Sequence, residues 1–580
     1  MCIRDSYYTI YIGLKLVMSD EFEIPGRSFA KGDDDIFEAM ERPDDSNQAI
    51  NFYNSSKEYV TTSDGSLIIT TRAIKTHYIE WDKGHFRAEH RTKNYTSGMI
   101  QTWNKFCFTG GVLEMAVDLP GESTSGGLWP AIWMVGNLAR ATFQDSTMGI
   151  WPWSYDKCGD IDHLDTKQEI NACNSEPGYG LNSNQGRGAP EIDIFEVMPG
   201  HNMPGYSKPV EPFMSNSLQI SPGIPKDSKQ FKRPINGKKL NSSYSWYEGI
   251  RMGPNSQFND GFWGQECGPV YDGTKDRVHK YQEDAISVNT VLQNTHFDTS
   301  HIYRLEWQPG HYGYLDWYLD DELVFSIEGS SIHELTGAMI PEEPMYLILN
   351  TAISHQWGMP EPCDIANCPT CWRCYDCTNP ECQCGLPDGM KFCKNLPAEM
   401  RIDYIRLYQD PSDPSHELSC SPLSHPTAEF IAAHPERYSD WQDYDGLLPV
   451  GFGLFEIIYL TIIISIILII SHFISKYFCN FGKNRYIPDH NYHMNVLKHH
   501  MTTKVTIGAG ASSKSKNPTF QKQDFNYSEI QTSNNIKRST SPFVKHNIAP
   551  AIQAKAKNFV HSNNLINTES NEKKYLLTKV

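Results

Sequence analysis

Short segments in which apolar and polar residues alternate recur along the first 410 residues, and they limit what this chain can fold into. Residues 111–119 are the clearest case, because apolar side chains at 113, 115, 117 and 119 alternate with acidic ones at 114 and 118. A period of two is typical of a strand with one buried face. Alternation or β-branched composition likewise predicts strands over residues 16–22, 66–72, 301–307, 314–319, 322–325, 345–350 and 400–408, with a hairpin turn at Asp320–Asp321.

Long amphipathic helical patterns are scarce over the same residues. With 39% hydrophobic residues in 580, the chain can bury a large core. Many short strands with Gly- and Pro-rich joints predict an all-β fold, a β-sandwich or jelly roll. Residues 136–190 and 198–300 are predicted to be long loop insertions that form functional rims.

The hexamer Glu191-Ile-Asp-Ile-Phe-Glu196 places three acids in an apolar segment typical of a buried strand. In a regular strand Glu191 and Asp193 share a face and Glu196 points to the other. One β-bulge between Asp193 and Glu196 would return Glu196 to the shared face, with the two glutamate Cα atoms about 13 Å apart. Their carboxyls could then approach to about 5 Å, the separation found in retaining glycosidases. The alternative is a sheet face with scattered solvated acids.

Charge divides the chain unevenly. Residues 476–580 contain 16 Lys and Arg against 5 Asp and Glu, whereas residues 1–475 contain 35 against 64. The acidic body argues against a nucleic-acid partner. The basic segment is predicted to be a disordered cytoplasmic tail.

An apolar run over residues 450–475 is long enough to cross a bilayer as a single C-terminal transmembrane helix. Basic residues follow it and acidic ones precede it, so the positive-inside rule predicts a type I membrane protein. The body would be lumenal or extracellular, in the endoplasmic reticulum, Golgi, vacuole or at the plasma membrane. Glu456 within the run is either functional or interfacial. Residues 411–449 are predicted to be a juxtamembrane stalk, and residues 1–15, which lack a signal-peptide pattern, a truncated or replaced N-terminus.

Glycosylation sequons and cysteines agree with that compartment. The sequons begin at Asn54, Asn94 and Asn241, and eight of the 15 cysteines lie within residues 363–393. Their C-x-x-C spacings also resemble zinc ligands, but an oxidising lumen favours disulfides, and no metal or cofactor is expected. The predicted disulfide cysteines are Cys158 with Cys173 and, with the pairing left open, Cys363, Cys368, Cys371, Cys374, Cys377, Cys382, Cys384 and Cys393.

The hexamer and its surroundings carry a resemblance to a known family. EIDIFEV resembles the bulged catalytic strand of glycoside hydrolase family 16, and GGLWPAIWMVGNLARA (126–141) and GRGAPEIDIFEV (186–197) are similar to its branch of fungal β-glucan-synthesis-associated membrane glycoproteins. SDEF, HIYRLEW, MYLILN and IDYIRLYQ continue the match in order. The resemblance covers residues 16–410, including the Cys-rich insert at 363–393, and implies a concanavalin-like β-jelly roll. The fungal relatives resemble type II proteins, whereas here the predicted span follows the domain.

The resemblance also implies roles for the three acids. Glu191 looks like the nucleophile that forms a covalent glycosyl-enzyme, and Glu196 like the acid that later acts as base. Asp193 would hold a proton or a hydrogen bond between them. Because three neighbouring carboxylates cannot all ionise cheaply, their titrations should be coupled, and Glu196 can stay protonated near neutral pH.

Aromatic platforms are expected for the sugar rings. Trp129 and Trp133 lie in the matching motif and, by resemblance, line the donor side of the cleft. We expect only one of them to face the groove unless Pro130 breaks the regularity of the strand, with the other in the core. Further substrate-binding candidates are Trp103, Asn137, Arg140 and Trp357. Trp103, Trp151, Trp153 and Trp357 are each expected to be mainly structural, and the alternative for Asn137 and Arg140 is a solvated surface position.

These features predict an enzyme, a retaining β-glucan-active glycoside hydrolase or transglycosylase. Its role would be the assembly or remodelling of 1,6- or 1,3-linked wall or storage β-glucan. The predicted partners are β-glucan, the membrane and the glucan-synthesis machinery. The alternative is a non-catalytic scaffold that holds glucan for a glucan synthase.

Overall fold

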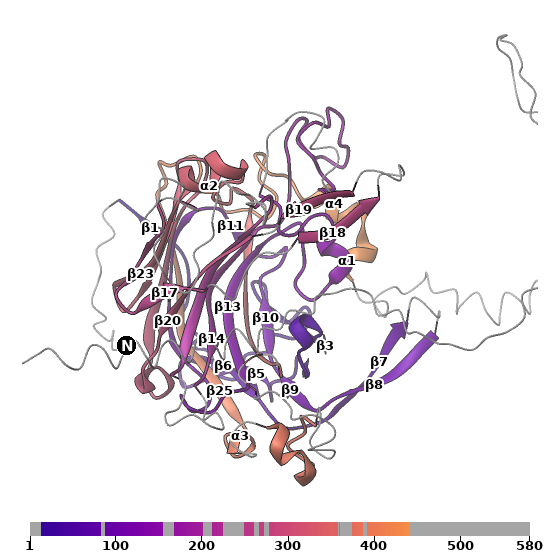
Figure 1. Cartoon of the computed structure of the whole chain (residues 1–580), viewed down its shortest axis with the longest axis vertical. Helices are drawn as coiled ribbons and strands as arrows, with labels where there is room; N and C mark the ends of the chain where they lie inside the picture. Colours follow the sequence, from indigo (N-terminus) through magenta and orange to yellow (C-terminus); the bar gives the residue numbers. More distant parts are fainter. Residues whose placement is uncertain are drawn as a thin grey trace, which may run out of the picture. The chain divides into compact units, whose positions relative to one another are not determined.

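Two antiparallel β-sheets of nine strands each make up most of the chain that the structure describes. The computed structural model describes residues 13–439, with gaps at 83–86, 155–167, 201–210, 224–246, 248, 260–265, 272–277, 283, 356, 358, 360–373 and 387–390. Strands of both sheets run beside one another in Figure 1.

We call the sheets the β12 sheet and the β14 sheet, after a strand in each. The β12 sheet runs in the spatial order β16 (Arg251–Met252), β23 (Glu322–Glu328), β22 (Tyr314–Leu319), β21 (His301–Gln308), β12 (Gly111–Asp118), β25 (Ala398–Gln409), β6 (Ser66–Thr71), β5 (Val60–Ser63), with β1 (Lys15–Asp20) also on β25. The β14 sheet runs β17 (Ser256–Phe258), β20 (Asp284–Val291), β15 (Phe213–Ile220), β14 (Glu191–Met198), β13 (Leu128–Gly136), β24 (Met345–Ile353), β10 (Met99–Gln101), β2 (Glu38–Ala39), with β11 (Cys107–Phe108) also on β24.

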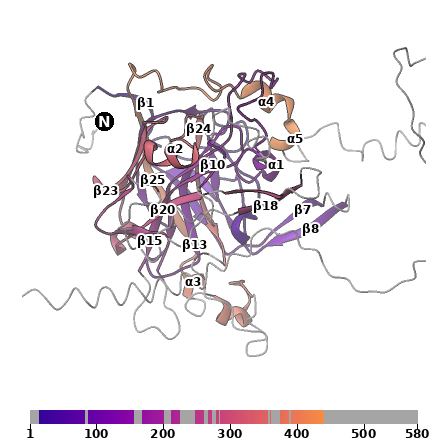
Figure 2. The same cartoon turned by 45° about the horizontal axis from the view of Figure 1, so that its top comes forward.

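Smaller elements surround the two sheets. Figure 2 shows the hairpin of β7 and β8 projecting from them. The remaining strands are β3 (Arg42–Pro43), β4 (Asn51–Tyr53), β7 (Thr76–Asp82), β8 (Arg87–Lys93), β9 (Tyr95–Ser97), β18 (Glu266–Tyr271) and β19 (Val278–Gln282). The helices are η1 (Ser46–Gln48), α1 (Gln144–Thr147), η3 (Asn294–Phe297), α2 (Gly329–Thr336), η4 (Pro380–Gly385), α3 (Lys391–Lys394), α4 (Ala428–Ala433) and α5 (Pro435–Tyr438).

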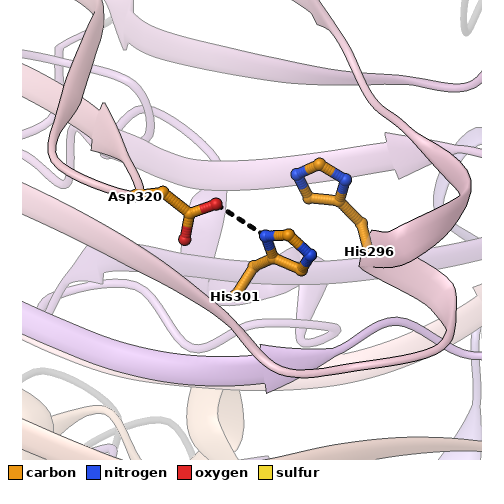
Figure 3. Close-up of side chains that lie close together, drawn as sticks. All are labelled: His296, His301 and Asp320. Atoms are coloured by element: carbon orange, nitrogen blue, oxygen red, sulfur yellow. Dashed lines mark hydrogen bonds and ion pairs between the residues drawn. The ribbon is translucent and has the colours of Figure 1, made fainter. Parts of the chain in front are cut away.

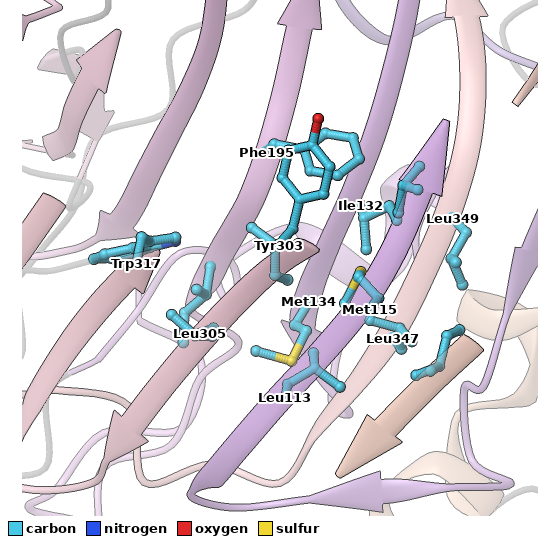
Figure 4. Close-up of a cluster of buried hydrophobic side chains, with 14 of the residues drawn as sticks. Leu113, Met115, Ile132, Met134, Phe195, Tyr303, Leu305, Trp317, Leu347 and Leu349 are labelled. Carbon is cyan, nitrogen blue, oxygen red and sulfur yellow. The ribbon is translucent and has the colours of Figure 1, made fainter. Parts of the chain in front are cut away.

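The hydrophobic core lies between the facing sides of the two sheets (Figure 4). The alternating side chains at 113, 115, 117 and 119 are all in it, as the sequence predicted. Ile132 and Met134 of β13 reach it from the β14 sheet. The predicted strands are present, and the hairpin turn between β22 and β23 has Asp320 and Asp321 at φ 49° and 65°. The predicted β-sandwich is therefore confirmed.

The prediction that residues 198–300 form an irregular insertion was wrong. This segment supplies β15 and β20, which pair with each other beside β14. Met214, Leu218 and Ile286 of these strands face the core, although the polar Asn216 interrupts the alternation of β15. Residues 136–190, by contrast, contain only the end of β13 at Gly136 and the four-residue α1 as regular structure among their described members, so the prediction of a loop insertion is confirmed there.

The prediction of a stalk beginning at residue 411 was also wrong for residues 411–439. Cys420 forms a disulfide with Cys107 of β11, across a sequence separation of 313 residues. Tyr438 is 2% exposed, and its hydroxyl donates to the carbonyl of Leu138 at 2.8 Å. Buried side chains and a covalent link make residues 411–439 part of the folded body, which we call the C-terminal segment.

The Cys-rich insert contains disulfides, as predicted. Cys374 pairs with Cys382 and Cys377 with Cys393, and Cys173 and Cys384 are also disulfide-bonded. Cys158, Cys363, Cys368 and Cys371 lie outside the described residues. Sequence reasoning missed the bond between Cys107 and Cys420.

Other predictions concern residues that the structure does not describe. The predicted span at 450–475 and the tail after it lie outside the described residues. Among the described residues, no helix combines the length and the apolar character that crossing a membrane requires. Of the three sequons, Asn54 and Asn94 are partly exposed and Asn241 is not described.

We predict that the long-range disulfide stabilises the body more than the short-range one. Replacing Cys107 and Cys420 together by Ser should lower the free energy of unfolding by about 2–5 kcal/mol, because the crosslink restricts a very long loop in the unfolded chain. The matched control replaces Cys374 and Cys382 by Ser. This disulfide closes a loop of only eight residues, so its loss should lower the free energy of unfolding by less. Denaturant unfolding of the full chain measures both. Equal losses would contradict the prediction.

Candidate active site

A β-bulge in β14 gathers the three acids on one face of the β14 sheet. Asp193 pairs with Ser217 of β15 and Glu196 with Ser215, so two residues of β14 stand opposite Asn216 alone. The two residues opposite Asn216, Ile194 and Phe195, both point into the core. The predicted bulge is therefore confirmed, and Glu196 lies on the same face as the other two acids.

Core side chains satisfy the backbone groups that the bulge leaves unpaired. Trp317, 1% exposed and reaching across from β22, donates its indole N–H to the carbonyl of Asp193 at 2.9 Å. The Asn216 amide donates to the carbonyl of Ile194 at 2.5 Å. A buried carbonyl without such a donor would cost about 1–3 kcal/mol, so these two contacts stabilise the bulge.

The neighbouring strands and loops provide donors to the carboxylates. Gln219 of β15 donates to Glu191 Oε1 at 2.7 Å and to Asp193 Oδ2 at 3.0 Å. Trp151, from the first insertion, donates its indole N–H to Glu191 Oε2 at 2.8 Å. The Ser217 hydroxyl also donates to Asp193 Oδ2. The pair of Glu191 and Asp193 therefore has four donated hydrogen bonds.

Glu196 has fewer donors. Its Oε1 accepts one hydrogen bond from the Trp129 indole at 3.2 Å. Its Oε2 is buried and has no hydrogen-bond partner among the described residues. A carboxyl with one free buried oxygen is better suited to hold a proton than one surrounded by donors.

Burial and mutual repulsion shift the pKa values of all three acids. Burial raises the pKa of Glu196 well above its usual range, and the charge of Asp193 raises it further. Burial also raises the pKa of Glu191 well above its usual range, as do the charges of Asp193 and Glu196, whereas the hydrogen bond from Trp151 opposes this. Burial raises the pKa of Asp193 too, against the hydrogen bonds from Ser217 and Gln219. Because the donors concentrate at Glu191 and Asp193, negative charge is favoured there and a proton on Glu196.

Trp129 and Trp133 both lie on the face of the acids, so the prediction that only one of them faces it was wrong. Residues four apart share a face in a regular strand, and β13 pairs with β24 without interruption through Pro130. The Trp129 ring stacks on Trp357 with centroids 4.6 Å apart, and Trp357 donates to the carbonyl of Val197 at 2.8 Å. Trp357 covers one face of Trp129, which is 8% exposed.

A chain of hydrogen bonds fixes Trp133, which is partly exposed. Its indole N–H donates to Asn350 Oδ1 at 2.8 Å, and the Asn350 amide donates to the Tyr53 hydroxyl at 3.1 Å. Tyr53 in turn donates to Asp44 Oδ2 at 2.5 Å. Trp133 and Trp357 are therefore partly exposed aromatic rings beside the acids, as is Trp151.

Three other predicted substrate-binding residues are structural, which corrects the sequence prediction. Asn137 is 0% exposed, and its amide donates to the Cys420 carbonyl and to Thr427 in the C-terminal segment. The Arg140 guanidinium donates to the Tyr438 carbonyl at 2.6 Å and forms an ion pair with Glu38. Trp103 stacks on the Tyr438 ring, with centroids 5.4 Å apart. All three hold the C-terminal segment, and none of these contacts involves the acids.

Sequence reasoning gave too little weight to two residues that contact the acids. Trp151 was expected to be mainly structural, yet it bonds Glu191. Gln219 was hidden in a segment taken for a loop, although its place in an alternating strand signalled that it shares a face with Ser217. Trp153, by contrast, is 1% exposed and structural, as expected.

Comparison with known proteins identifies relatives of the whole body. A family model described as "Beta-glucan synthesis-associated protein SKN1/KRE6/Sbg1" matches residues 11–230, 271–373 and 390–444. Beta-glucan synthesis-associated protein SKN1 of Candida albicans is 29% identical over 451 residues, which are 73% of this chain and 49% of the relative. KRE6 of Saccharomyces cerevisiae is 28% identical over 461 residues, which are 74% of this chain and 52% of the relative. The chain spans about half the length of the curated relatives it matches.

Solved structures with a similar chain path include glucanases. The laminarinase catalytic domain from Thermotoga maritima is 18% identical, with 69% of this chain and 99% of that chain covered and a TM-score of 0.35. LamAcat from Zobellia galactanivorans is 22% identical, with 68% and 97% covered and a TM-score of 0.34.

We predict that Glu196 makes the body less stable as the pH rises. The pKa of this carboxyl is near 4.5 in the unfolded chain and is raised by folding. Its contribution to the free energy of unfolding is fully present below the unfolded pKa and is lost as the pH rises from that value through the folded pKa. Glu196→Gln should therefore gain stability relative to the wild type, by up to about 1.4 kcal/mol for each pH unit in that window. Denaturant unfolding at a series of pH values measures the difference. A difference that stays constant from pH 4.5 to 8 would contradict the prediction.

Proposed function

Because this chain belongs to the family of β-glucan synthesis-associated proteins SKN1/KRE6/Sbg1, we propose that its β14 sheet carries a retaining transglycosylase or glycosidase site for β-glucan. The observation that carries the proposal is the bulge that sets Glu191 and Glu196 on one face with Asp193 between them. Retaining glycosidases use two such carboxyls, one as nucleophile and one as acid and base.

Glu191 is the nucleophile in the proposed mechanism. Its carboxylate attacks the anomeric carbon of the glucan, a glycosyl-ester bond forms, and the bond to the leaving oxygen breaks. Trp151 and Gln219 hold the two carboxylate oxygens, so attack needs only a small change in the orientation of the side chain. As Glu191 loses its charge to the ester, its electrostatic repulsion with Asp193 disappears.

Glu196 is the acid and later the base. It gives its proton to the leaving oxygen, and its Oε2, which has no partner among the described residues, is the atom available for this. The resulting carboxylate then takes a proton from the second attacker, which breaks the ester and restores both side chains. Water as attacker gives hydrolysis, and a sugar hydroxyl gives transfer.

Transfer is the proposed outcome, because the relatives are named for β-glucan synthesis and synthesis requires that new glycosidic bonds form. The proposed substrates are 1,3- and 1,6-linked β-glucans of a wall or a storage polymer. Trp133 and Trp357 are the proposed platforms for the apolar faces of the glucose rings.

We predict different losses for the two glutamates when the full chain is incubated with β-1,3- and β-1,6-oligoglucosides. Glu191→Gln should lower turnover by on the order of 10⁴-fold or more, since no covalent intermediate forms. Glu196→Gln should lower it by about 10²–10⁴-fold on natural substrates, since the leaving oxygen is no longer protonated. The matched control is Glu114→Gln, because Glu114 is 8% exposed like Glu196 but lies on β12 and accepts from Tyr404.

Azide separates the two roles by stereochemistry. With a substrate whose leaving group needs no protonation, Glu196→Ala with azide should yield the β-glycosyl azide, since azide attacks the covalent intermediate. Glu191→Ala with azide should yield the α-glycosyl azide by direct displacement. The same anomer from both variants would refute the assignment. A wild type that binds glucan but turns over none of these substrates would favour the scaffold function.

The site is also proposed to face a lumenal or extracellular compartment, supported by the disulfides of the body. We predict that protease added to sealed vesicles removes residues after the apolar run at 450–475 and spares the body, as seen by immunoblotting each end of the chain. Digestion of the body with protection of the tail would reverse the orientation.

A further inference from the structure

Two histidines and an aspartate gather far along the chain from the acids of β14 (Figure 3). His296 lies in η3, which follows β20 of the β14 sheet, and His301 begins β21 of the β12 sheet. Asp320 is in the turn between β22 and β23. One potential ligand atom from each of the three lies within 4.8 Å of the others. We propose that this cluster is a binding site for a divalent transition-metal ion, for which Zn²⁺ is the probe.

The donor set suits such an ion. Two imidazole nitrogens and one carboxylate oxygen are ligands that Zn²⁺ takes in proteins, and a fourth position remains for water. Harder ions such as Mg²⁺ and Ca²⁺ prefer sites made of oxygen alone. The site therefore selects for a borderline transition metal.

His296 is a buried side chain with an unused nitrogen. It is 5% exposed, and its Nε2 has no hydrogen-bond partner among the described residues. Its Nδ1 accepts a hydrogen bond from the backbone N–H of Gln293 at 3.1 Å and also lies 3.1 Å from the carbonyl oxygen of that residue. The hydrogen of the neutral ring is then on Nε2. Binding of an ion at Nε2 requires the other tautomer, in which Nδ1 carries the hydrogen and donates to the Gln293 carbonyl, as outer hydrogen bonds usually orient metal-binding histidines. Burial and the neighbouring His301 also lower the pKa of His296, which keeps the ring neutral.

His301 and Asp320 already share one hydrogen. His301 Nδ1 lies 2.6 Å from Asp320 Oδ2, and the backbone N–H of Ile302 donates to the other oxygen, Asp320 Oδ1, at 2.9 Å. A metal ion can replace the hydrogen between nitrogen and oxygen. Tetrahedral Zn²⁺ with bonds of about 2.0–2.1 Å needs its ligand atoms about 3.3 Å apart, so this pair has to open by less than about 1 Å.

The third ligand requires a small rotation. The His296 and His301 rings are stacked, with centroids 3.8 Å apart and planes 16° from parallel. Both lone pairs can meet one ion only if a ring turns out of the stack. Asp320 can follow this movement, because its side chain is 47% exposed and lies in a turn.

The bound ion would join three separate elements. It would link the crossover from the β14 sheet to the β12 sheet with the hairpin of β22 and β23. The backbone N–H of Leu119, at the end of β12, already donates to the His296 carbonyl at 2.9 Å, so η3 is held at the site without the ion. The ion would therefore stabilise this end of the body rather than build it.

The test compares metal binding by the full chain and two variants after removal of metal with EDTA. Zn²⁺ content is measured by elemental analysis after gel filtration, and the Tm is measured with and without equimolar Zn²⁺. Co²⁺ added in place of Zn²⁺ reports a four-coordinate site by its visible absorption. We expect Zn²⁺ to raise the Tm by on the order of 5 °C, and Mg²⁺ and Ca²⁺ to have no such effect.

Variants assign the bound ion to this cluster rather than to cysteines elsewhere. His296→Gln should bind one equivalent less Zn²⁺ than the wild type and lose the rise in Tm. Asp320 is exposed, so Asp320→Asn tests the site without changing a buried side chain. This variant should weaken Zn²⁺ binding at least tenfold. The matched control is His311→Gln, because the His311 and His333 rings also lie close together, with centroids 3.6 Å apart, but belong to no three-ligand group among the described residues. Wild-type stoichiometry and Tm shift in both His296→Gln and Asp320→Asn would overturn the proposal.

Discussion

The β-bulge in β14 is the feature on which the rest of the site depends. Without the extra residue, Glu196 would point into the core with Ile194, and burial of an unpaired carboxyl there would be costly. The bulge leaves carbonyls with no ladder partner, and Trp317 and Asn216 satisfy them from the core side. The alignment of the acids therefore depends on the packing of the two sheets, because Trp317 belongs to the opposite sheet.

The same arrangement explains how three buried acids can coexist. Their pKa values rise together because burial and repulsion act on each of them. The donors are distributed unevenly, with Trp151 and Gln219 at Glu191 and a single indole at Glu196. The donors therefore favour charge at Glu191 over charge at Glu196, and such a difference is what a nucleophile and an acid require.

The sequence alone could predict the bulge, because the three acids of this apolar strand can lie on one face only if the strand contains one extra residue between Asp193 and Glu196. It also predicted the strands whose alternation is complete. Sequence reasoning did not predict β15, because Asn216 interrupts the alternation there. This side chain is polar because it donates to the Ile194 carbonyl in the bulge. The C-terminal segment was missed because its Pro- and Ser-rich composition resembles a stalk, and no local pattern reveals a partner for Cys420 that is 313 residues away.

The C-terminal segment contacts residues that lie next to the candidate site in the sequence and in the fold. Arg187, just before β14, forms a bidentate ion pair with Glu343 and donates to the carbonyl of Pro426 in that segment at 2.6 Å. Next to it, Gly188 packs so closely on Trp153 that a Cβ would lie 2.2 Å from the Trp153 carbonyl oxygen. Trp151, two residues earlier, is the donor to Glu191. Residues near Glu191 are therefore in contact with the C-terminal segment, which the Cys107–Cys420 bond joins to β11, so residues 411–439 belong to the folded body and not to a linker.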